Sequence, residues 1–322
     1  MKLTKCLETV LRAPKDYSLD LTLRIYNFHW YYLGNGRGYV FLELDPPIVA
    51  FVAQKGPATL SARIYSVTCR DIDANNVSQQ LSFHLGPEED LSEFLDLASR
   101  DPLLKLFAKK FRGWRLRTTS LWWALVIGIC QQNTGFRQGW RMLANIIKLL
   151  GKRVWVEDRE VPLPPSPLEL IEKHTLLKPA GVGYRWRTLF EVATRFARRE
   201  LKPSRLYSMD TAGAEKVLRN IRGVGSYTAR LALALSLRKY ELPPIDRWAK
   251  KIFSYAYQVD ENEAERECIR RWGRWSALAV IALTIALDAE PLKRALERVK
   301  RGELLPNERN TLSPYNLWMW KF

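Results

Sequence analysis

The chain has 322 residues, enough for two or three ordinary domains that each bury a hydrophobic core. Hydrophobic residues make up 47%, yet no apolar run reaches the ~18 charge-free residues of a membrane-spanning helix, so the composition excludes a membrane-spanning protein and indicates a soluble one. The formal charge of +17 attracts polyanions and makes nucleic acid the first partner to expect; a membrane surface and the charged coat of a thermophilic protein are the alternatives.

The N-terminal segment and the cysteines indicate an intracellular protein. MKLTKCLETVLRAPKDYSLDL lacks the apolar stretch and cleavage site of a signal peptide. Cys6, Cys69, Cys130 and Cys268 are far apart and form neither a CxxC pair nor a cluster with histidine. This spacing argues against zinc, an iron–sulfur cluster and a disulfide scaffold, and it favours a reducing environment.

Residues 20–44 are rich in β-branched and aromatic side chains and are interrupted by Gly34-Asn35-Gly36, a pattern that predicts a β-hairpin. The segments IVAFVAQ (48–54), ATLSARIYSVTC (58–69) and QQLSFHL (79–85) continue the strand pattern. We therefore expect a small antiparallel sheet over roughly residues 18–85.

After Gly86 the pattern becomes helical. Leu91, Phe94 and Leu95 begin one apolar helical face, and helices are predicted from there to the end of the chain. The exception is 156–173, where four prolines indicate a connecting loop. The sequence thus predicts an α+β protein, with an antiparallel sheet domain over 1–86 and a mainly helical part over 87–322.

A glycine-rich turn separates two helices in the second half of the chain. The segment from Asp210 to Asn220 is predicted to form one helix, with Asp210 or Thr211 as its N-cap, and a second helix begins at about Ser226. Gly223 and Gly225 lie in the turn, where glycine permits positive φ and the close approach of another molecule.

The start of the second helix has the chemistry of an anion site. Its free amides and dipole favour negative charge, and the hydroxyls of Ser226 and Thr228 add donors. A DNA phosphate suits such a site, with Arg222 and Arg247 as basic neighbours. The alternative is an ordinary helix–helix turn, in which glycine is common.

Asp246 follows Pro243-Pro244 and leads into the next helical segment. Alone, this acid is explained as an N-cap. Hairpin and acid together, with Asp246 nineteen residues after Tyr227, resemble the helix-hairpin-helix, Gly/Pro-rich, Asp-containing superfamily of DNA glycosylases.

Three further blocks resemble the 3-methyladenine and 8-oxoguanine branches of that superfamily and their archaeal relatives. They run in family order and are FHLGPEEDLSEFLDLASRDPLLKLFAKKFRGWRL (83–116), LWWALVIGICQQNT (121–134) and GVGYRWRTLFEVATRFA (181–197). The resemblance implies a two-lobed helical core after the sheet domain, with the hairpin motif at about 211–237 and a catalytic loop at about 241–248.

The resemblance also implies a chemistry. Enzymes of this superfamily flip a damaged nucleotide out of the duplex, and a carboxylate assists the departure of its base. Asp246 matches that acid. Tyr227 stands where the lyase branches carry lysine, and Tyr227-Thr228-Ala229 looks like the alkylation-repair version, which implies hydrolysis by water without strand cleavage. Lys239, Lys250 or Lys251 could still reach the pocket.

A base pocket built from Tyr227, Trp248 and Trp272 is expected. Aromatic walls favour an alkylated purine, because stacking and cation–π attraction suit a positively charged base. Trp248 departs from the histidine that many members carry two residues after the acid, and the Gly-Tyr-Arg block leans toward the oxidised-purine branch. Gln132 matches the residue that fills the gap left by the flipped base.

The expected partner is double-stranded DNA with a damaged base, bound by a monomer without a required cofactor or a membrane. No side chains predict a metal site, although the resemblance implies a monovalent cation on hairpin carbonyls near Ile221 and Val224. Two alternatives stay open. One is an 8-oxoguanine-type glycosylase and lyase with a displaced lysine, and the other is a non-catalytic helix-hairpin-helix DNA-binding protein.

Overall fold

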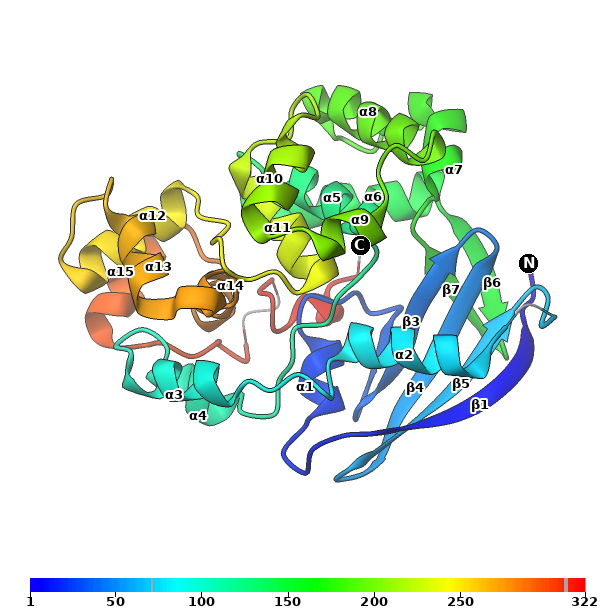
Figure 1. Cartoon of the computed structure of the whole chain (residues 1–322), viewed down its shortest axis with the longest axis horizontal. Helices are drawn as coiled ribbons and strands as arrows, with labels where there is room; N and C mark the ends of the chain where they lie inside the picture. The colour runs from blue at the N-terminus through cyan, green and yellow to red at the C-terminus, as the bar shows by residue number, and fades with distance from the viewer. Residues whose placement is uncertain (71, 310–311, 322) are drawn as a thin grey trace.

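The computed structural model describes residues 1–70, 72–309 and 312–321. The N-terminal part is an antiparallel sheet with the strand order β1-β5-β4-β3-β2 (Figure 1). Its strands are β1 (Thr4–Arg12), β2 (Tyr32–Gly34), β3 (Arg37–Leu44), β4 (Pro47–Gly56) and β5 (Thr59–Ser66). We call residues 1–86 the sheet domain.

Two helices of the sheet domain stand where strands were predicted. They are α1 (Leu19–Arg24) and α2 (Ala74–Leu85), and α2 runs across the sheet in Figure 1. Asp73 caps α2 by accepting from the Asn75 and Asn76 amides, and the apolar residues Val77, Leu81 and Leu85 recur with helical spacing and are buried. The cap and this spacing outweigh the strand propensity of 79–85.

The sheet also begins earlier than the predicted residue 18. β1 pairs along its length with β5, and Thr4 lies opposite Ser66. This pairing brings Cys6 and Cys69 together, and they form a disulfide across 63 residues of chain. The prediction against a disulfide was wrong, because sequence spacing does not show which cysteines a strand pairing aligns. Cys130 and Cys268 are free and buried.

The helical part forms two lobes in Figure 1. The central lobe contains α5 (Leu121–Gln131), α6 (Phe136–Leu150), α7 (Pro167–Glu172), α8 (Trp186–Ala197), α9 (Pro203–Ser208), α10 (Thr211–Arg219) and α11 (Ser226–Leu237). The outer lobe contains α3 (Ser92–Arg100), α4 (Lys105–Lys110), α12 (Arg247–Tyr257), α13 (Ala264–Trp272), α14 (Ser276–Ala286) and α15 (Leu292–Arg301). Short 3₁₀ turns cover His174–Leu177, Gly183–Arg185, Gly273–Trp275 and Leu317–Met319.

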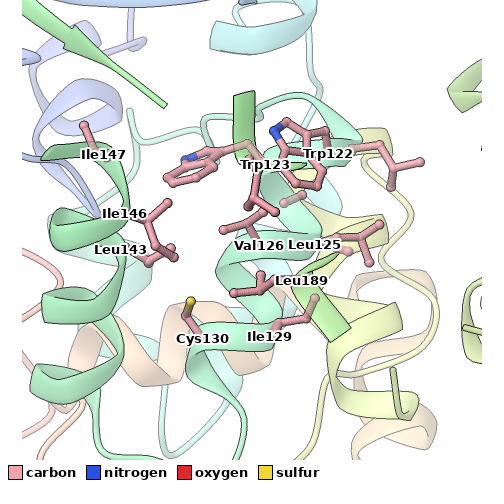
Figure 2. Close-up of a cluster of buried hydrophobic side chains, with 14 of the residues drawn as sticks. Trp122, Trp123, Leu125, Val126, Ile129, Cys130, Leu143, Ile146, Ile147 and Leu189 are labelled. Carbon is pink, nitrogen blue, oxygen red and sulfur yellow. The ribbon is translucent and has the colours of Figure 1, made fainter. Parts of the chain in front are cut away.

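Helix α5 forms the core of the central lobe and is buried over most of its length. Figure 2 shows Leu143 and Ile146 of α6 pointing toward it. A helix that is apolar on nearly all sides must be surrounded by other elements, so α5 can serve as a fixed base for the residues at its C-terminal end.

A β-hairpin occupies the start of the predicted 156–173 loop. Strands β6 (Lys152–Val156) and β7 (Arg159–Leu163) pair there, and the Leu3 amide donates to the Trp155 carbonyl at 2.8 Å. Glu157, in the turn, accepts hydrogen bonds from Arg63 and Tyr65 of β5. Contacts with the sheet domain therefore hold the two-stranded unit in place. The proline content of 156–173 is a local feature and gave no sign of these long-range contacts.

The α+β class, with an antiparallel sheet followed by helices, is confirmed. Within the residues described, no helix is both long and apolar enough to cross a membrane.

The disulfide can be tested by counting thiols. Denatured protein prepared without reductant should show two reactive thiols, from Cys130 and Cys268, and four after reduction. Because the bond closes a long loop in the unfolded chain, reduction should lower the free energy of unfolding by about 2–4 kcal/mol. Four thiols without reductant would contradict the Cys6–Cys69 bond.

Candidate active site

The predicted glycine-rich hairpin is present between α10 and α11. Asp210 caps α10, its Oδ1 accepting from the Gly213 amide at 2.7 Å. Gly225 stands at the N-cap of α11, where no side-chain hydrogen bond caps the helix. The amides of the first turn of α11 thus have no side-chain acceptor at the cap position, which leaves them available to an external anion.

The two glycines of the turn differ in backbone conformation and in the space around them. Gly223 has φ of +86°, and a Cβ there would lie 2.0 Å from Oγ1 of Thr188 on α8. Gly225 has φ of −92°, which any residue adopts, and a Cβ there would meet nothing within 4 Å. Gly223 is needed by the fold, whereas Gly225 keeps the outer surface of the turn open.

A groove of about 520 Å³ runs beside the hairpin. It is lined by residues 219–225, Gln132, Asn133 and Tyr184. Arg222 is exposed and makes no ion pair within the described part of the chain, and Tyr184 is 60% exposed. The groove combines backbone amides, a free guanidinium and an aromatic ring, so it can bind a phosphate with an attached base.

The side chains of Gln132 and Thr228 are hydrogen-bonded to each other, with Gln132 half-buried at the groove and Thr228 beneath it. Thr228 is only 1% exposed, and its hydroxyl donates to Oε1 of Gln132 at 2.9 Å. The Gln132 carbonyl accepts from Arg185 at 2.6 Å. Thr228 therefore holds α11 against the end of α5, and its predicted role as a DNA-contacting hydroxyl is corrected. The Gln132 side chain is likewise engaged within the protein.

Asn133 is the residue that the sequence prediction missed here. It is exposed, lines the groove and has φ of +50°. Asparagine tolerates this left-handed conformation and commonly follows a helix end, which was the available signal. The backbone turn after α5 thus presents the exposed Asn133 to the groove beside the half-buried Gln132.

A cavity of about 960 Å³ lies where the two lobes and the sheet domain meet. Tyr227, Asp246 and Trp248 all line it, so three of the four residues predicted for catalysis and the base pocket come together. Trp272 does not. It is 2% exposed, packs on Phe94 in the core of the outer lobe with ring centroids 5.8 Å apart, and is no part of the cavity wall.

Asp246 is both the N-cap of α12 and a cavity residue. Its Oδ1 accepts from the Ala249 amide at 2.8 Å, which fixes the carboxyl at the start of the helix. Part of the side chain is exposed at the cavity. Desolvation by the surrounding chain nevertheless raises the pKa of Asp246, while the amides of Ala249 and Trp248 act in the opposite direction. The carboxylate is oriented and made more basic than an ordinary aspartate.

The residues near Asp246 are held in place by packing and hydrogen bonds. Burial raises the pKa of the Tyr227 phenol, and the charge of Asp246 raises it further, so Tyr227 stays protonated. The indole of Trp248 donates to the Glu290 carbonyl at 2.8 Å.

Two residues predicted to bind DNA stand at helix starts. Ser226 is half-buried at the first position of α11, and Arg247 is exposed at the first position of α12.

Further aromatic rings come from distant parts of the chain. Tyr26 of the sheet domain stacks on Trp140 of α6 at 5.9 Å, and Phe136 packs beside both. All three line the cavity. Their separation in sequence gave no signal that they would meet.

Lysine is absent from the described residues that line the cavity. The ammonium group of Lys239 donates to the Met209 carbonyl, and Lys251 pairs with Glu261 at 3.3 Å. Lys250 is no part of the wall either.

No group of three metal-binding side chains occurs among residues 1–70, 72–309 and 312–321. At the hairpin, the Ile221 carbonyl accepts from the Val224 amide at 3.0 Å, and a carbonyl oxygen can still offer a second lone pair to a cation. The ion at this turn stays a prediction.

No protein-family model matches the chain. Its sequence is 34% identical over 170 residues to a DNA-3-methyladenine glycosylase of Bacillus subtilis, a match over 49% of this chain and 54% of that protein. The chain thus spans about half the length of the curated relative that it matches.

Two solved structures share the fold. The 3-methyladenine DNA glycosylase of Archaeoglobus fulgidus has a TM-score of 0.68 at 18% identity and covers 86% of this chain and 96% of its own. The 8-oxoguanine glycosylase/lyase of Clostridium acetobutylicum, in complex with double-stranded DNA that has cytosine opposite 8-oxoguanine, has a TM-score of 0.65 at 20% identity. That match covers 94% of this chain and 100% of the other. The predicted resemblance is confirmed in sequence and in fold.

The two glycines should respond differently to alanine. Gly223→Ala introduces a strained φ and a clash with Thr188, and it should lower the free energy of unfolding by about 1–3 kcal/mol. Gly225→Ala should leave the stability within about 0.5 kcal/mol of wild type. Urea denaturation of both variants measures this, and equal losses would contradict the separate roles.

Proposed function

We propose that this chain is a DNA glycosylase that flips a damaged purine out of double-stranded DNA and hydrolyses its N-glycosidic bond without cutting the strand. The observation that carries the proposal is the oriented carboxylate of Asp246 in a large cavity with aromatic walls, next to the hairpin groove. We further propose that it acts as a monomer without a required cofactor.

Several features support DNA as the partner. The net charge of +17 favours a polyanion. The hairpin groove offers the amide-rich turn at Gly225, the exposed guanidinium of Arg222 and the ring of Tyr184. A phosphate bound at the turn would fix the DNA backbone, while Tyr184 would stack on a base beside the lesion. The Clostridium protein of the same fold binds double-stranded DNA, which agrees with this arrangement.

The cavity supports base flipping. Its volume of about 960 Å³ is of the size used for small-molecule binding and exceeds what one purine fills. Tyr26, Trp140, Tyr227 and Trp248 provide flat apolar surfaces on which a flipped base can stack. Stacking in the cavity would offset part of the cost of removing the base from the duplex.

Asp246 would supply the chemistry. As the bond between the sugar C1′ and the base nitrogen breaks, the electron pair leaves with the base and positive charge develops on the sugar. The carboxylate stabilises this charge and accepts a proton from the water that attacks C1′. The Ala249 amide holds one carboxyl oxygen, so the group is oriented before the substrate arrives.

Two observations support hydrolysis without strand cleavage. Tyr227 carries a phenol that cannot form a Schiff base with the sugar. In addition, none of the described lining residues is a lysine, and Lys239 and Lys251 are engaged elsewhere. A lyase reaction would require an amine that reaches the sugar.

Asn133 is proposed to fill the gap that the flipped base leaves. It stands exposed at a positive φ beside the hairpin, whereas the Gln132 amide is hydrogen-bonded to Thr228. A polar side chain at that position can bond the unpaired partner base and recover part of the lost stacking.

Base release from duplexes with single lesions tests the function. Wild-type protein should give strand breaks only after hot alkali, and borohydride should trap no covalent adduct. Asp246→Asn should lower the rate by about 100-fold or more, because it removes the charge that stabilises the transition state. DNA affinity should stay unchanged. Breaks without alkali would favour the lyase alternative, and no release by wild type despite DNA binding would leave a binding protein.

The gap-filling role is tested with Asn133→Ala and Gln132→Ala. Asn133→Ala should slow base release from duplex DNA by about tenfold and leave release from single-stranded DNA unchanged, because a single strand has no gap to fill. Gln132→Ala should lower the melting temperature through loss of the Thr228 bond and leave the duplex to single-strand ratio of rates unchanged. The reverse pattern would restore Gln132 as the gap-filling residue.

A further inference from the structure

The cavity is lined by several residues with buried polar atoms that have no hydrogen-bond partner in the described chain. They are Nε of Arg117, Oγ1 of Thr119, Nε2 of Gln131 and Nε1 of Trp140. Buried polar groups are normally hydrogen-bonded, so an unpaired donor that lines a cavity can be met by a ligand there.

Arg117 is the unusual member of this group. It lies in the segment between α4 and α5, and its Nη2 donates to the Tyr26 carbonyl at 3.1 Å. It makes no ion pair within the described residues. Burial lowers the pKa of Arg117 to about 10, so the guanidinium is still charged at neutral pH.

Two other buried arginines, Arg298 and Arg115, make more hydrogen bonds or ion pairs than Arg117 does. Arg298 pairs with Asp288 at 2.8 Å and also donates to three carbonyls. Arg115, two residues before Arg117, donates to the carbonyls of Glu89, Arg112 and Trp114. Arg117 thus holds unused donor capacity in a place where an uncompensated charge is costly.

The chemistry of the wall selects among bases. The guanidinium of Arg117 and the indole of Trp140 can only donate, whereas Gln131 and Thr119 can donate or accept. A base that faces Arg117 must offer an acceptor, and the carbonyl oxygen at C6 of a 6-oxopurine is one. A positively charged base would instead be repelled, and the low dielectric of the cavity strengthens the repulsion.

We propose that Arg117 is a specificity-determining residue that reads the carbonyl oxygen of a neutral 6-oxopurine and discriminates against cationic alkylated purines. The inference rests on the proposed glycosylase function and reverses the preference for alkylated bases expected from aromatic content alone. The same aromatic walls stack on neutral purines, so Arg117 decides between the two classes.

Three lesions that share the carbonyl at C6 are used to test the effect of the charge of the base. 8-oxoguanine and hypoxanthine are neutral 6-oxopurines, whereas 7-methylguanine carries the same carbonyl with a positive charge. Single-turnover release is measured from duplexes with each lesion. Wild type should act faster on the neutral lesions, and Arg117→Met should slow their release by about tenfold or more while 7-methylguanine release is unchanged or faster.

Two variants serve as controls. Arg117→Lys keeps the charge and loses the planar fork, so it should still reject 7-methylguanine but release the neutral lesions slowly. Arg112→Met removes an exposed arginine of the same segment that pairs with Asp16 at 3.5 Å, and it should change no rate. Melting temperatures of all variants show whether each one folds.

An equal slowing by Arg117→Met on all three lesions would overturn the proposal, and so would a wild-type preference for 7-methylguanine. Binding separates this failure from that of the proposed function. Asp246→Asn protein should bind 8-oxoguanine duplexes more tightly than 7-methylguanine duplexes, and Asp246→Asn with Arg117→Met should lose this difference. If no lesion is released but this binding pattern is found, the hydrolysis proposal fails and the role of Arg117 stands; if the pattern is absent too, both fail.

Discussion

The close packing of α11 on α5 sets the geometry of both the groove and the cavity. It depends on Gly128 of α5, where a Cβ would lie 3.0 Å from Cγ2 of Thr228 on α11. At this contact Thr228 bonds Gln132, and the chain leaves α5 in the direction that exposes Asn133. One residue before Thr228, Tyr227 reaches the cavity. A single helix contact therefore places residues of both sites in a fixed relation.

Asp246 shows how one side chain can serve the fold and the chemistry. As an N-cap it accepts the Ala249 amide and starts α12, and as a cavity residue it is partly desolvated. Hydrogen bonds from the amides lower the pKa of the carboxyl and favour its ionised form, whereas desolvation raises the pKa and makes the carboxylate more basic. The two interpretations offered by the sequence, a cap and a catalytic acid, are compatible because the cap bond engages Oδ1 alone.

The sheet domain contributes to the cavity as well as to the fold. Tyr26 comes from the segment after α1, stacks on Trp140 and accepts a hydrogen bond from Arg117 through its carbonyl. This contact links the sheet domain, the segment before α5 and helix α6 around the proposed base pocket. A chain that lacked the sheet domain would lose one wall and the bond that orients the guanidinium.

The sequence by itself determined the fold class, the helix–turn–helix around Gly223 and Gly225, and the position of Asp246 before α12, because caps, glycine turns and apolar spacing act over a few residues. It also supported the resemblance, because the spacing between motifs can be read directly from the sequence.

Local patterns failed where the outcome depended on distant partners. Residues 79–85 form part of a capped helix, Cys6 and Cys69 are joined through strand pairing, and Trp272 is buried in the core of the outer lobe. Only the tertiary structure decided that Thr228 faces inward, that Asn133 faces the groove, and that Arg117 and Tyr26 line the cavity with Asp246. The physical reason is that these positions follow from side-chain packing between segments far apart in the sequence, and such packing has no signature within any one segment.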